Sequence, residues 1–249
     1  MSEIQPHQPC LTKSHPISVN WFTRPNHRSF SPTIIAVTFA LLVLFGWQGT
    51  TPALAGEDDA PIIKVGERVP DFTLTNLEGK SVSLHDYKGK IVILEWFNPD
   101  CPFVKAAHTK GILKNLGNKI SKKKSVVWLA INSGAPGKQG AGLEHNQRMK
   151  KKYNINYPIL LDEAGKVGRL YGAKKTPHMF VIDGKGILRY QGAIDNDPFA
   201  EKNARGEKVI SYVELALRDV EEGTEVASPV TKPYGCTVKY APKSKNHGG

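Results

Sequence analysis

The sequence predicts an α/β fold in which helices flank a central mixed β-sheet, with a β-hairpin added at the N-terminal side. Strand and helix patterns alternate between residues 71 and 222, which is typical of a sheet covered by helices. A hairpin pattern opens this stretch. A second hairpin pattern precedes its last helix, residues 208–222, which has the clearest amphipathic pattern in the chain.

The first 55 residues are predicted to be a secretory signal peptide. Residues 1–30 are polar and carry two arginines near their end, residues 33–47 form an uncharged, mostly apolar run, and small residues lead up to Ala55. We therefore expect cleavage after Ala55 and export to the periplasm or the extracellular space. The alternative is an uncleaved membrane anchor over residues 33–48, although a span needs about 20 residues. Only that form would contact a membrane.

The chain after the predicted cleavage site divides into three regions. Residues 56–70 are a polar lead-in, and residues 71–222 form a single predicted domain that is long enough to bury a sizeable core. Residues 223–249 form a tail rich in proline, lysine and glycine, which we expect to be irregular. This tail carries Cys236.

The positive charge of the chain does not indicate a nucleic-acid-binding protein. The formal net charge is +11, and the excess lies in scattered runs at residues 122–124 and 150–152 and in the tail. No aromatic-interleaved pattern accompanies these runs, so we expect solvated surface and no nucleic-acid binding. Since the cysteines and histidines lack zinc-ligand spacing, no metal or cofactor is predicted.

The predicted domain starts with a β-hairpin and a central strand. Residues 72–75 and 81–84 alternate apolar and polar side chains on either side of a turn at residues 76–79. A further short turn leads to residues 91–97, which begin with an uninterrupted apolar run. Such a run indicates a buried strand.

A cysteine stands at the turn that ends this central strand. Asn98-Pro-Asp100 breaks the strand, and Pro102 suits the first turn of a helix. We expect that helix over residues 102–116, with a kink at Gly111. Cys101 would then lie where the N–H groups of the helix terminus point, and their partial positive charge favours the reactive thiolate. The alternative is an inert cysteine in the core.

Seven further segments complete the predicted domain. They are a buried strand (125–131), a glycine- and proline-rich loop (132–142), a polar helix (144–153), a short strand (157–161), a short helix (166–171), a hairpin (178–183 with 187–191) and the last helix (208–222). The loop does not match a phosphate-binding motif, because Gln139 follows Gly137-Lys138, so we expect a mobile surface loop. The element order places the cysteine turn at the C-terminal end of a central strand, where open sheets form their sites.

Three local sequences carry a resemblance to a known family. Glu95-Trp-Phe-Asn-Pro-Asp-Cys101 is similar to the strand, turn and cysteine of thioredoxins, Lys175-Thr-Pro-His178 to the threonine–cis-proline element, and Phe180 to Leu188 to the last hairpin. Over residues 62–222 the chain resembles the thioredoxin-like superfamily. It is most similar to the redoxin branch, which includes the peroxiredoxins (the alkyl hydroperoxide reductase–thiol-specific antioxidant family). The resemblance implies a thioredoxin-like fold with a cis-proline facing the cysteine.

Two departures from the family patterns leave the reaction open. Val104 stands where a thioredoxin has its second cysteine, whereas Asn98 and Leu94 replace the hydroxyl residue and the proline of a typical peroxiredoxin. The resemblance implies a thiol-dependent oxidoreductase with peroxiredoxin-like antioxidant activity or thiol–disulfide exchange activity. Its partners would be a peroxide or a protein disulfide and an external thiol reductant.

The proposed nucleophile, Cys101, has a candidate partner in Cys236. Because Cys10 would leave with the signal peptide, these are the two thiols of the exported chain, and an oxidising compartment favours their pairing. In the enzyme hypothesis Cys236 is the resolving cysteine. In the alternative, the chain is a non-catalytic thioredoxin-fold binding or scaffold protein, and the two cysteines form a structural disulfide.

Three side chains are expected to adjust the protonation of this thiol. Glu95 matches the position of a buried carboxylate that accepts protons in thioredoxins, the alternative being a strand-end glutamate that reaches water. Lys105 and His108 follow Cys101 at helical spacing, on the face nearest to it, and either could lower the thiol pKa or move a proton. The alternatives are a surface lysine and a structural helix histidine.

The remaining candidates would contact the substrate. The Asn98 side chain could donate to a peroxide oxygen. A cis bond before Pro177 would turn the backbone of Thr176 toward the cysteine and offer an edge for a substrate chain. Thr176, Pro177 and Pro102 make up the expected substrate-binding site.

Overall fold

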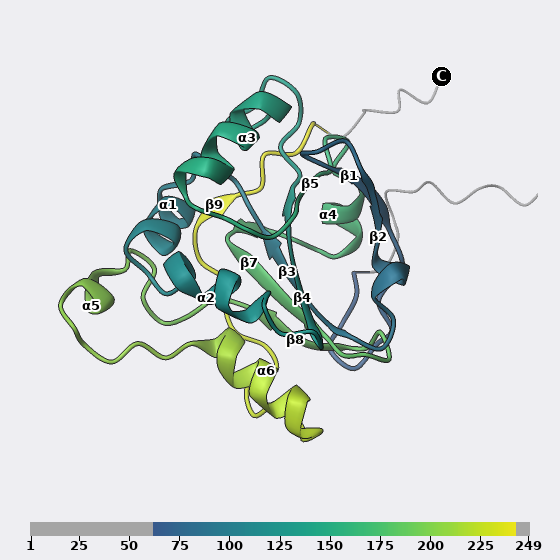
Figure 1. Cartoon of the computed structure of the whole chain (residues 1–249), viewed down its shortest axis with the longest axis vertical. Coiled ribbons are helices and arrows are strands. Elements are labelled where there is room, and N and C mark those ends of the chain that lie inside the picture. Colours follow the sequence, from purple (N-terminus) through teal and green to yellow (C-terminus); the bar gives the residue numbers. More distant parts are fainter. Residues whose placement is uncertain (1–61, 243–249) are drawn as a thin grey trace, which may run out of the picture. The chain divides into compact units, whose positions relative to one another are not determined.

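The computed structural model describes residues 62–242 (Figure 1). The predicted signal peptide and its cleavage site lie outside the described residues. None of the helices within residues 62–242 is long and apolar enough to cross a membrane. The predicted α/β architecture, a mixed sheet with helices on both faces, is confirmed.

The described strands form two sheets. They are β1 (Thr73–Asn76), β2 (Ser81–Ser83), β3 (Ile91–Trp96), β4 (Val126–Asn132), β5 (Ile159–Leu161), β6 (Lys175–Thr176), β7 (His178–Ile182), β8 (Leu188–Gly192) and β9 (Cys236–Thr237). The larger sheet has the order β2-β1-β5-β4-β3-β7-β8, and β3 pairs in parallel with β4 and antiparallel with β7. The predicted N-terminal hairpin, β1 with β2, extends this sheet beyond β5. The smaller sheet pairs β6 with β9.

Helices cover both faces of the larger sheet (Figure 1). They are the 3-10 helix η2 (Leu84–Tyr87) and the α-helices α1 (Pro102–Thr109), α2 (Leu113–Ile120), α3 (Leu143–Lys152), α4 (Lys166–Leu170), α5 (Glu201–Ala204) and α6 (Tyr212–Glu222). Apolar side chains of α1, α2 and α6 pack against one face, and those of η2 and α4 pack against the other. The sheet is therefore buried on both sides, which explains the uninterrupted apolar run of β3.

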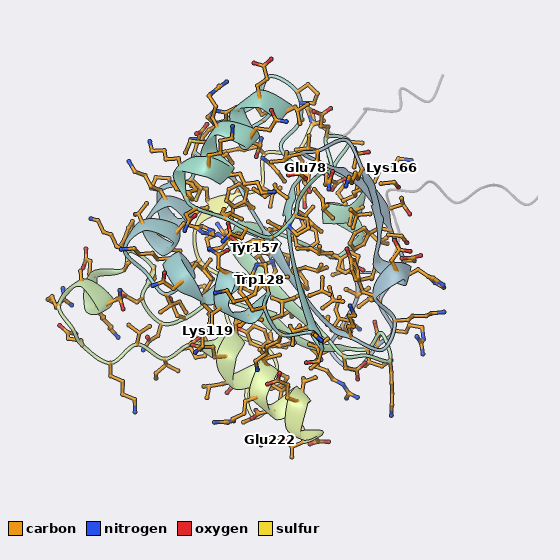
Figure 2. All side chains as sticks on the ribbon, in the orientation of Figure 1. Glu78, Lys119, Trp128, Tyr157, Lys166 and Glu222 are labelled. Carbon is orange, nitrogen blue, oxygen red and sulfur yellow. The ribbon has the colours of Figure 1, made fainter. Side chains whose placement is uncertain are left out.

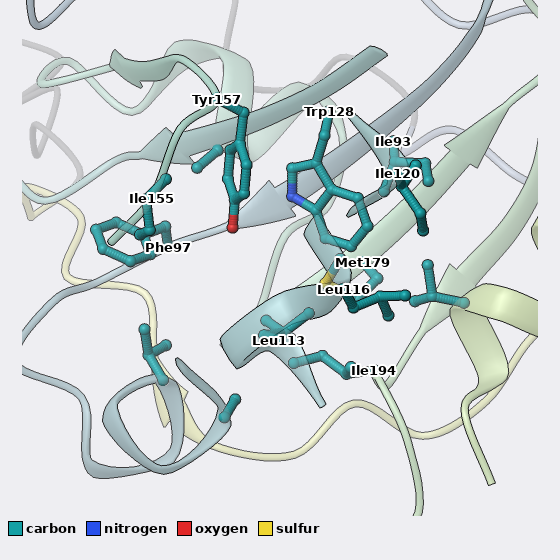
Figure 3. Close-up of a cluster of buried hydrophobic side chains, with 14 of the residues drawn as sticks. Ile93, Phe97, Leu113, Leu116, Ile120, Trp128, Ile155, Tyr157, Met179 and Ile194 are labelled. Atoms are coloured by element: carbon teal, nitrogen blue, oxygen red, sulfur yellow. The ribbon is translucent and has the colours of Figure 1, made fainter. Parts of the chain in front are cut away.

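The two faces of β3 contribute to two separate hydrophobic cores. Val92, Leu94 and Trp96 belong to the core beneath α4. Ile93 and Phe97 belong to the core beneath α1 and α2, which Figure 3 shows. This alternation follows from the pleat of a strand, in which successive side chains point to opposite faces.

Charged side chains lie mainly at the surface, as the scattered charge runs predicted. The lysines at positions 122–124 are all exposed. In Figure 2, Trp128 and Tyr157 lie at the centre of the ribbon, whereas Glu222 lies at the outer end of α6. The run at residues 122–124 therefore solvates the surface, whereas Lys150 of the second run is partly buried and pairs with Glu78 at 2.7 Å.

The continuous helix predicted over residues 102–116 is wrong, because the structure divides it into α1 and α2. The predicted kink position, Gly111, lies in the short break between them. A Cβ at this position would lie 2.9 Å from Cα of Ala107 and 3.2 Å from Cβ of Ala200. The close approach of these neighbours requires glycine, and the chain changes direction there.

The predicted mobile surface loop, residues 132–142, is instead held by buried amides. Nδ2 of Asn132 donates to the carbonyl oxygen of Gly140 (2.8 Å) and to Oδ1 of Asn146 (2.9 Å). Asn146 also donates to Gly140, at 3.0 Å. Both asparagines are buried, so they satisfy loop carbonyls that would otherwise need water. The tip of the loop, residues 136–139, is exposed, as is Gly142 at its end.

The last helix begins later than predicted. The pattern indicated residues 208–222, but α6 starts at Tyr212, after the N-cap residue Ser211. The Ser211 hydroxyl accepts a hydrogen bond from the backbone N–H of Glu214 (3.3 Å). Serine is a favoured N-cap, and this signal would have given the correct boundary.

Candidate active site

Cys101 lies between the end of β3 and the start of α1. It is the N-cap residue of α1, and Pro102 stands at the first turn. The Cys101 side chain is 0% exposed, and its Sγ lies 2.9 Å from the carbonyl oxygen of Thr176. The cysteine therefore stands at the N-terminus of α1, with its thiol donating to the Thr176 carbonyl.

The element that faces Cys101 is the end of β6. The peptide bond between Thr176 and Pro177 is cis, as the family resemblance implied. Thr176 is buried, and its backbone carbonyl contacts the thiol. Its side-chain Oγ1 has no hydrogen-bond partner within residues 62–242. A buried hydroxyl of this kind costs stability, which makes a role in binding worth testing.

Cys236 lies in β9, directly opposite Thr176 in the antiparallel pair. Both cysteines are free thiols in this structure, and the Cys236 thiol is in hydrogen-bond contact with Cys101. Burial, followed by this hydrogen bond and the charge of Cys101, raises the pKa of Cys236 to about 11, although Lys239 and Lys175 oppose the shift. The structure thus brings the two thiols together from distant parts of the chain.

Glu95 is fully buried within β3 and is not a strand-end residue that reaches water. Its Oε1 lies 2.8 Å from Nε2 of His108. Its Oε2 accepts hydrogen bonds from Nε1 of Trp128 (3.1 Å) and from the hydroxyl of Tyr157 (3.0 Å). Burial, then the charge of Glu95 and this hydrogen bond, raise the pKa of Tyr157 well above its ordinary value, so Tyr157 remains a donor.

The two candidate helix residues have different positions. His108 is buried, and its ring stacks on Tyr153 at 5.7 Å with an interplanar angle of 10°. It also meets the Phe97 ring edge-on at 5.7 Å. Lys105 is exposed on α1. The exposure of Lys105 fits the alternative of a surface lysine, and its effect on the thiol stays a prediction.

Tyr153 connects the histidine to the cysteine turn, and sequence reasoning missed it. Its hydroxyl donates to the carbonyl oxygen of Pro99 (2.7 Å). Burial, then the charges of Asp100 and Cys101, raise the pKa of Tyr153 to about 12. The only signal in the sequence was an aromatic residue at the end of a polar helix. Its ring lies between the Cys101 turn and His108.

Asn98 holds the turn and the neighbouring loop. Its Oδ1 accepts from the backbone N–H of Asp100 (2.9 Å), and its Nδ2 donates to the carbonyl oxygen of Gln139 (3.2 Å). The side chain is 2% exposed, and Gly140 packs directly against its amide. One N–H of this amide is taken by the backbone of the loop, so the expectation that the second N–H donates to a peroxide stays a prediction.

An aromatic group adjoins Pro102 at the surface. Phe103 packs against Phe199, with ring centroids 4.4 Å apart, and against Tyr234 at 6.1 Å. Phe199 is 52% exposed, and Pro102 is also exposed. These rings come from three distant segments, so the sequence pattern gave no indication that they would meet.

Within the described residues the tail is largely irregular and contains one short strand, β9. Up to residue 242 it runs along the domain as an extended segment, drawn in yellow in Figure 1, and includes β9. We call residues 230–241 the C-terminal strap. Tyr234 of the strap donates to Oδ1 of Asp195 at 2.7 Å. Burial raises the pKa of this carboxyl, and the hydrogen bond partly opposes the rise.

The site combines groups that suit thiol chemistry. Two thiols lie in contact, and a buried carboxylate–imidazole pair lies behind the turn that carries the first. Within residues 62–242, no group of three or more His, Cys, Asp or Glu side chains could hold a metal ion. Such an arrangement can form and break sulfur bonds and move the accompanying protons.

Two relatives have similar sequences. The chain is 29% identical over 156 residues to the thiol-disulfide oxidoreductase ResA of Geobacillus thermodenitrificans, which covers 63% of this chain and 84% of that protein. It is 32% identical over 141 residues to a protein named as a peroxiredoxin, bcp, of Coxiella burnetii, covering 54% of this chain and 83% of that protein.

Solved structures and a family model agree with these similarities. An uncharacterised conserved protein from Geobacillus kaustophilus matches with a TM-score of 0.65 at 26% identity, covering 74% of this chain and 96% of that chain. A hypothetical protein from Sinorhizobium meliloti 1021 matches with a TM-score of 0.62 at 25% identity, covering 73% and 97%. The Redoxin family model matches residues 64–210, more than half of the chain. The chain therefore belongs to the Redoxin family and has a thioredoxin-like fold.

Proposed function

We propose that the protein is a thiol-dependent oxidoreductase in which Cys101 reacts with the substrate and Cys236 resolves the oxidised Cys101. The contact between these two free thiols, at the N-terminus of α1, carries the proposal. Relatives named as a thiol-disulfide oxidoreductase and as a peroxiredoxin support oxidoreductase chemistry at a thiol.

The first step is attack by the Cys101 thiolate. With a peroxide, sulfur bonds to one oxygen and the O–O bond breaks. Two electrons pass from sulfur to the peroxide, Cys101 becomes a sulfenic acid, and the second oxygen leaves as water or an alcohol after taking up a proton. With a disulfide substrate, the thiolate bonds to one sulfur, forms a mixed disulfide and releases the other sulfur as a thiol.

The second step uses Cys236. Its thiolate attacks Sγ of Cys101, which forms an intramolecular disulfide and releases water from the sulfenic acid, or the second substrate thiol from the mixed disulfide. Two external thiol groups then supply two electrons and two protons, become a disulfide themselves and return both cysteines to the reduced state.

The electrostatics of the pair support this order. Cys236, with a pKa of about 11, keeps its proton at neutral pH and can donate it in a hydrogen bond to the Cys101 sulfur. Two of the causes that raise this pKa are the hydrogen bond and the charge of Cys101 itself. Oxidation of Cys101 removes both, so the pKa of Cys236 falls and its thiolate becomes available for the second step.

The Glu95–His108 pair is proposed to take up the proton that Cys101 gives up. His108 lies two helical turns beyond Cys101 on α1 and is connected to the cysteine turn through Tyr153. A proton on the imidazole would be paired at once with the Glu95 carboxylate 2.8 Å away. These residues act on Cys101 through its protonation, so they are positioning residues rather than groups that touch the substrate.

Thr176 is proposed to bind the substrate oxygen. Its buried hydroxyl has no hydrogen-bond partner among the described residues, and its carbonyl contacts the thiol. One N–H of the Asn98 amide is engaged with the loop. The Thr176 hydroxyl would supply a further donor beside the thiol. Pro177 and Pro102 would bound the substrate position on either side.

Export is proposed from the pattern of residues 1–55. Fractionation of cells that produce the full chain, followed by N-terminal sequencing, tests it. A mature protein that begins at Gly56 and lies outside the cytoplasmic fraction is the expected result. Recovery of the uncleaved chain in the membrane fraction would support the anchor over residues 33–48 instead.

The proposed reaction is tested with the mature protein and its Cys101→Ser and Cys236→Ser variants. Peroxide consumption and disulfide reduction are measured in parallel with an external thiol. Cys101→Ser is expected to abolish activity, and Cys236→Ser to stop turnover after one reaction of Cys101. If neither activity depends on Cys101, the oxidoreductase proposal is wrong and the scaffold alternative stands.

A further inference from the structure

We propose that the C-terminal strap, residues 230–241, determines the class of substrate that reaches Cys101. The strap occupies the strand edge that an extended polypeptide needs, so the closed protein reacts with small oxidants such as peroxides and rejects polypeptide disulfides. The inference rests on the proposed function of Cys101 and names the substrate class of that site. Gly235 is the residue that allows the strap to close.

The strap already fills the edge beside the reactive thiol. Its strand β9 pairs antiparallel with β6, and Cys236 lies opposite Thr176. The backbone N–H of Val238 also donates to the carbonyl oxygen of Lys174 (3.3 Å). An extended peptide binds a sheet edge through the same backbone groups. A polypeptide substrate and the strap therefore compete for one edge.

Contacts before β9 hold the strap to the domain. Oγ1 of Thr231 accepts from the backbone N–H of Ala193 (2.9 Å) and shares a hydrogen bond with the hydroxyl of Tyr190 (2.6 Å). The hydroxyl of Tyr234 donates to Asp195 at 2.7 Å. Burial, then the charge of this carboxylate, raises the pKa of Tyr234, which therefore stays protonated as a donor.

Contacts after β9 hold the other end. The carbonyl oxygen of Lys239 accepts from the backbone N–H of Ala135 (2.9 Å), and the hydroxyl of Tyr240 donates to the carbonyl oxygen of Ala173 (2.8 Å). The guanidinium of Arg169 lies 4.4 Å from the centroid of the Tyr240 ring. Because the strap is held on both sides of β9, removing it from β6 breaks contacts at one end or the other.

Gly235 allows the close approach of the strap to β6. Its φ is +110°, a conformation that side chains with a Cβ rarely adopt. A Cβ here would overlap the carbonyl oxygen of Thr176 and lie 3.3 Å from Cδ of Pro177. The obstructing oxygen belongs to the backbone and cannot swing aside as the end of a flexible side chain can. Any larger residue at position 235 therefore displaces the strap from this edge.

This arrangement separates substrates by size. Cys101 is completely buried with the strap in place. A peroxide needs only a local separation at residues 235–236 to reach the sulfur. A polypeptide disulfide must also remove β9 and take over its pairing with β6. The strap thus favours small oxidants.

The test compares two substrates in one protein. The parent is the mature chain with Cys236→Ser, so that only Cys101 reacts, and the variant adds Gly235→Ala. Reaction of Cys101 with hydrogen peroxide is followed by loss of thiol labelling, and reaction with a linear peptide in mixed disulfide with thionitrobenzoate by absorbance. We expect the peptide-to-peroxide rate ratio to rise at least about tenfold in the Gly235→Ala variant.

A matched control separates strap release from glycine strain. Gly79→Ala places alanine at another positive φ, +76°, in the turn between β1 and β2, where a Cβ meets nothing within 4 Å. Its rate ratio is expected to equal that of the parent. If Gly235→Ala does not fold, the pair Thr231→Val and Tyr234→Phe loosens the same strap from its upstream anchors and should raise the ratio in the same direction.

Four outcomes separate the possibilities. A raised ratio in Gly235→Ala or in the anchor variant, with Gly79→Ala unchanged, supports the inference. The inference is overturned if a folded variant has a peptide-to-peroxide rate ratio within about twofold of the parent while the backbone N–H of Val238 exchanges its hydrogen faster than in the parent. If exchange at Val238 is unchanged, the claim that Gly235 seats the strap is itself overturned. No reaction of the parent Cys101 with either reagent rejects the proposed function rather than the strap alone.

Discussion

Glu95→Gln is the substitution that examines the buried proton acceptor most closely. Glutamine keeps the shape of the side chain and removes its charge. One amide oxygen can still accept from Trp128 and Tyr157, as Oε2 does in the structure. The amide nitrogen replaces Oε1 opposite His108, so the charged partner of the imidazole is lost.

The expected loss of stability follows from these contacts. Two of the three hydrogen bonds of Glu95 survive, and a hydrogen bond to a charged group contributes about 1.5–3 kcal/mol. We therefore expect Glu95→Gln to lower the free energy of unfolding by about 1–3 kcal/mol, which corresponds to a few degrees in Tm for a domain of this size. Glu95→Ala leaves buried donors without an acceptor and should cost about 3–5 kcal/mol.

Glu95→Gln is also expected to lower the reactivity of Cys101. Without Glu95, a proton taken up by His108 would form a buried imidazolium with no carboxylate beside it. We expect the reaction of Cys101 with peroxide at neutral pH to slow about 10- to 100-fold and its pH profile to move to higher pH. Stopped-flow measurement of the Cys101 reaction between pH 5 and 10, with urea unfolding of the same samples, provides both numbers.

Tyr157→Phe is the matched control for this experiment. It removes one donor to the same carboxylate, and the carboxylate stays charged. Its stability should fall by about 1 kcal/mol while the pH profile of Cys101 stays in place. If Glu95→Gln leaves both the rate and the pH profile like those of Tyr157→Phe, the carboxylate only supports the fold and the proton-acceptor role is refuted.

Three further predictions follow from the same contacts. Cys101→Ala should lower the pKa of the Cys236 thiol from about 11 toward the ordinary thiol range, because the hydrogen bond and charge of Cys101 are lost while the burial of Cys236 remains. The pH dependence of iodoacetamide labelling of Cys236 measures this pKa, and an unchanged midpoint would contradict the prediction. Burial and then the neighbouring Lys174 lower the pKa of His178 to about 4. Between pH 6.5 and 4 the unfolded chain therefore binds a proton that the folded chain lacks. About 3 kcal/mol of stability that is present above pH 6.5 should be lost as the pH falls to 4. Urea unfolding across that range checks it, and His178→Gln should flatten the dependence. Thr176→Val should leave stability unchanged or raised, because it removes a buried unpartnered hydroxyl, while slowing the peroxide reaction; an undiminished peroxide rate would remove the hydroxyl from the site.

Local sequence signals were sufficient for most of the fold. The apolar run of β3 and the alternation in β1 and β2 predicted strands because both follow from side-chain direction alone. The break between α1 and α2 was harder, since it depends on the approach of Ala200 to Gly111 from a distant segment. The loop at residues 132–142 was predicted to be mobile because the pattern cannot show that Asn146 reaches back to its carbonyls.

The parts of the candidate site that could be predicted are those that a local sequence signal marks. Cys101 followed from a strand-to-helix turn, and the residues around Pro177 from a family resemblance. The role of Tyr153, the engagement of Asn98 and the anchors of the strap depend on contacts between residues far apart in the chain. Such contacts leave no periodic pattern, so sequence reasoning had no means of finding them.

The most direct measurement is peptide mapping by mass spectrometry after one equivalent of hydrogen peroxide is added to the reduced mature protein. We expect a single linked species in which the peptides of Cys101 and Cys236 are joined by a disulfide. We also expect Cys236→Ser to trap Cys101 as a sulfenic acid. Overoxidised Cys101 beside an unreacted Cys236 thiol, or a thiol pair that peroxide leaves untouched, would contradict this expectation.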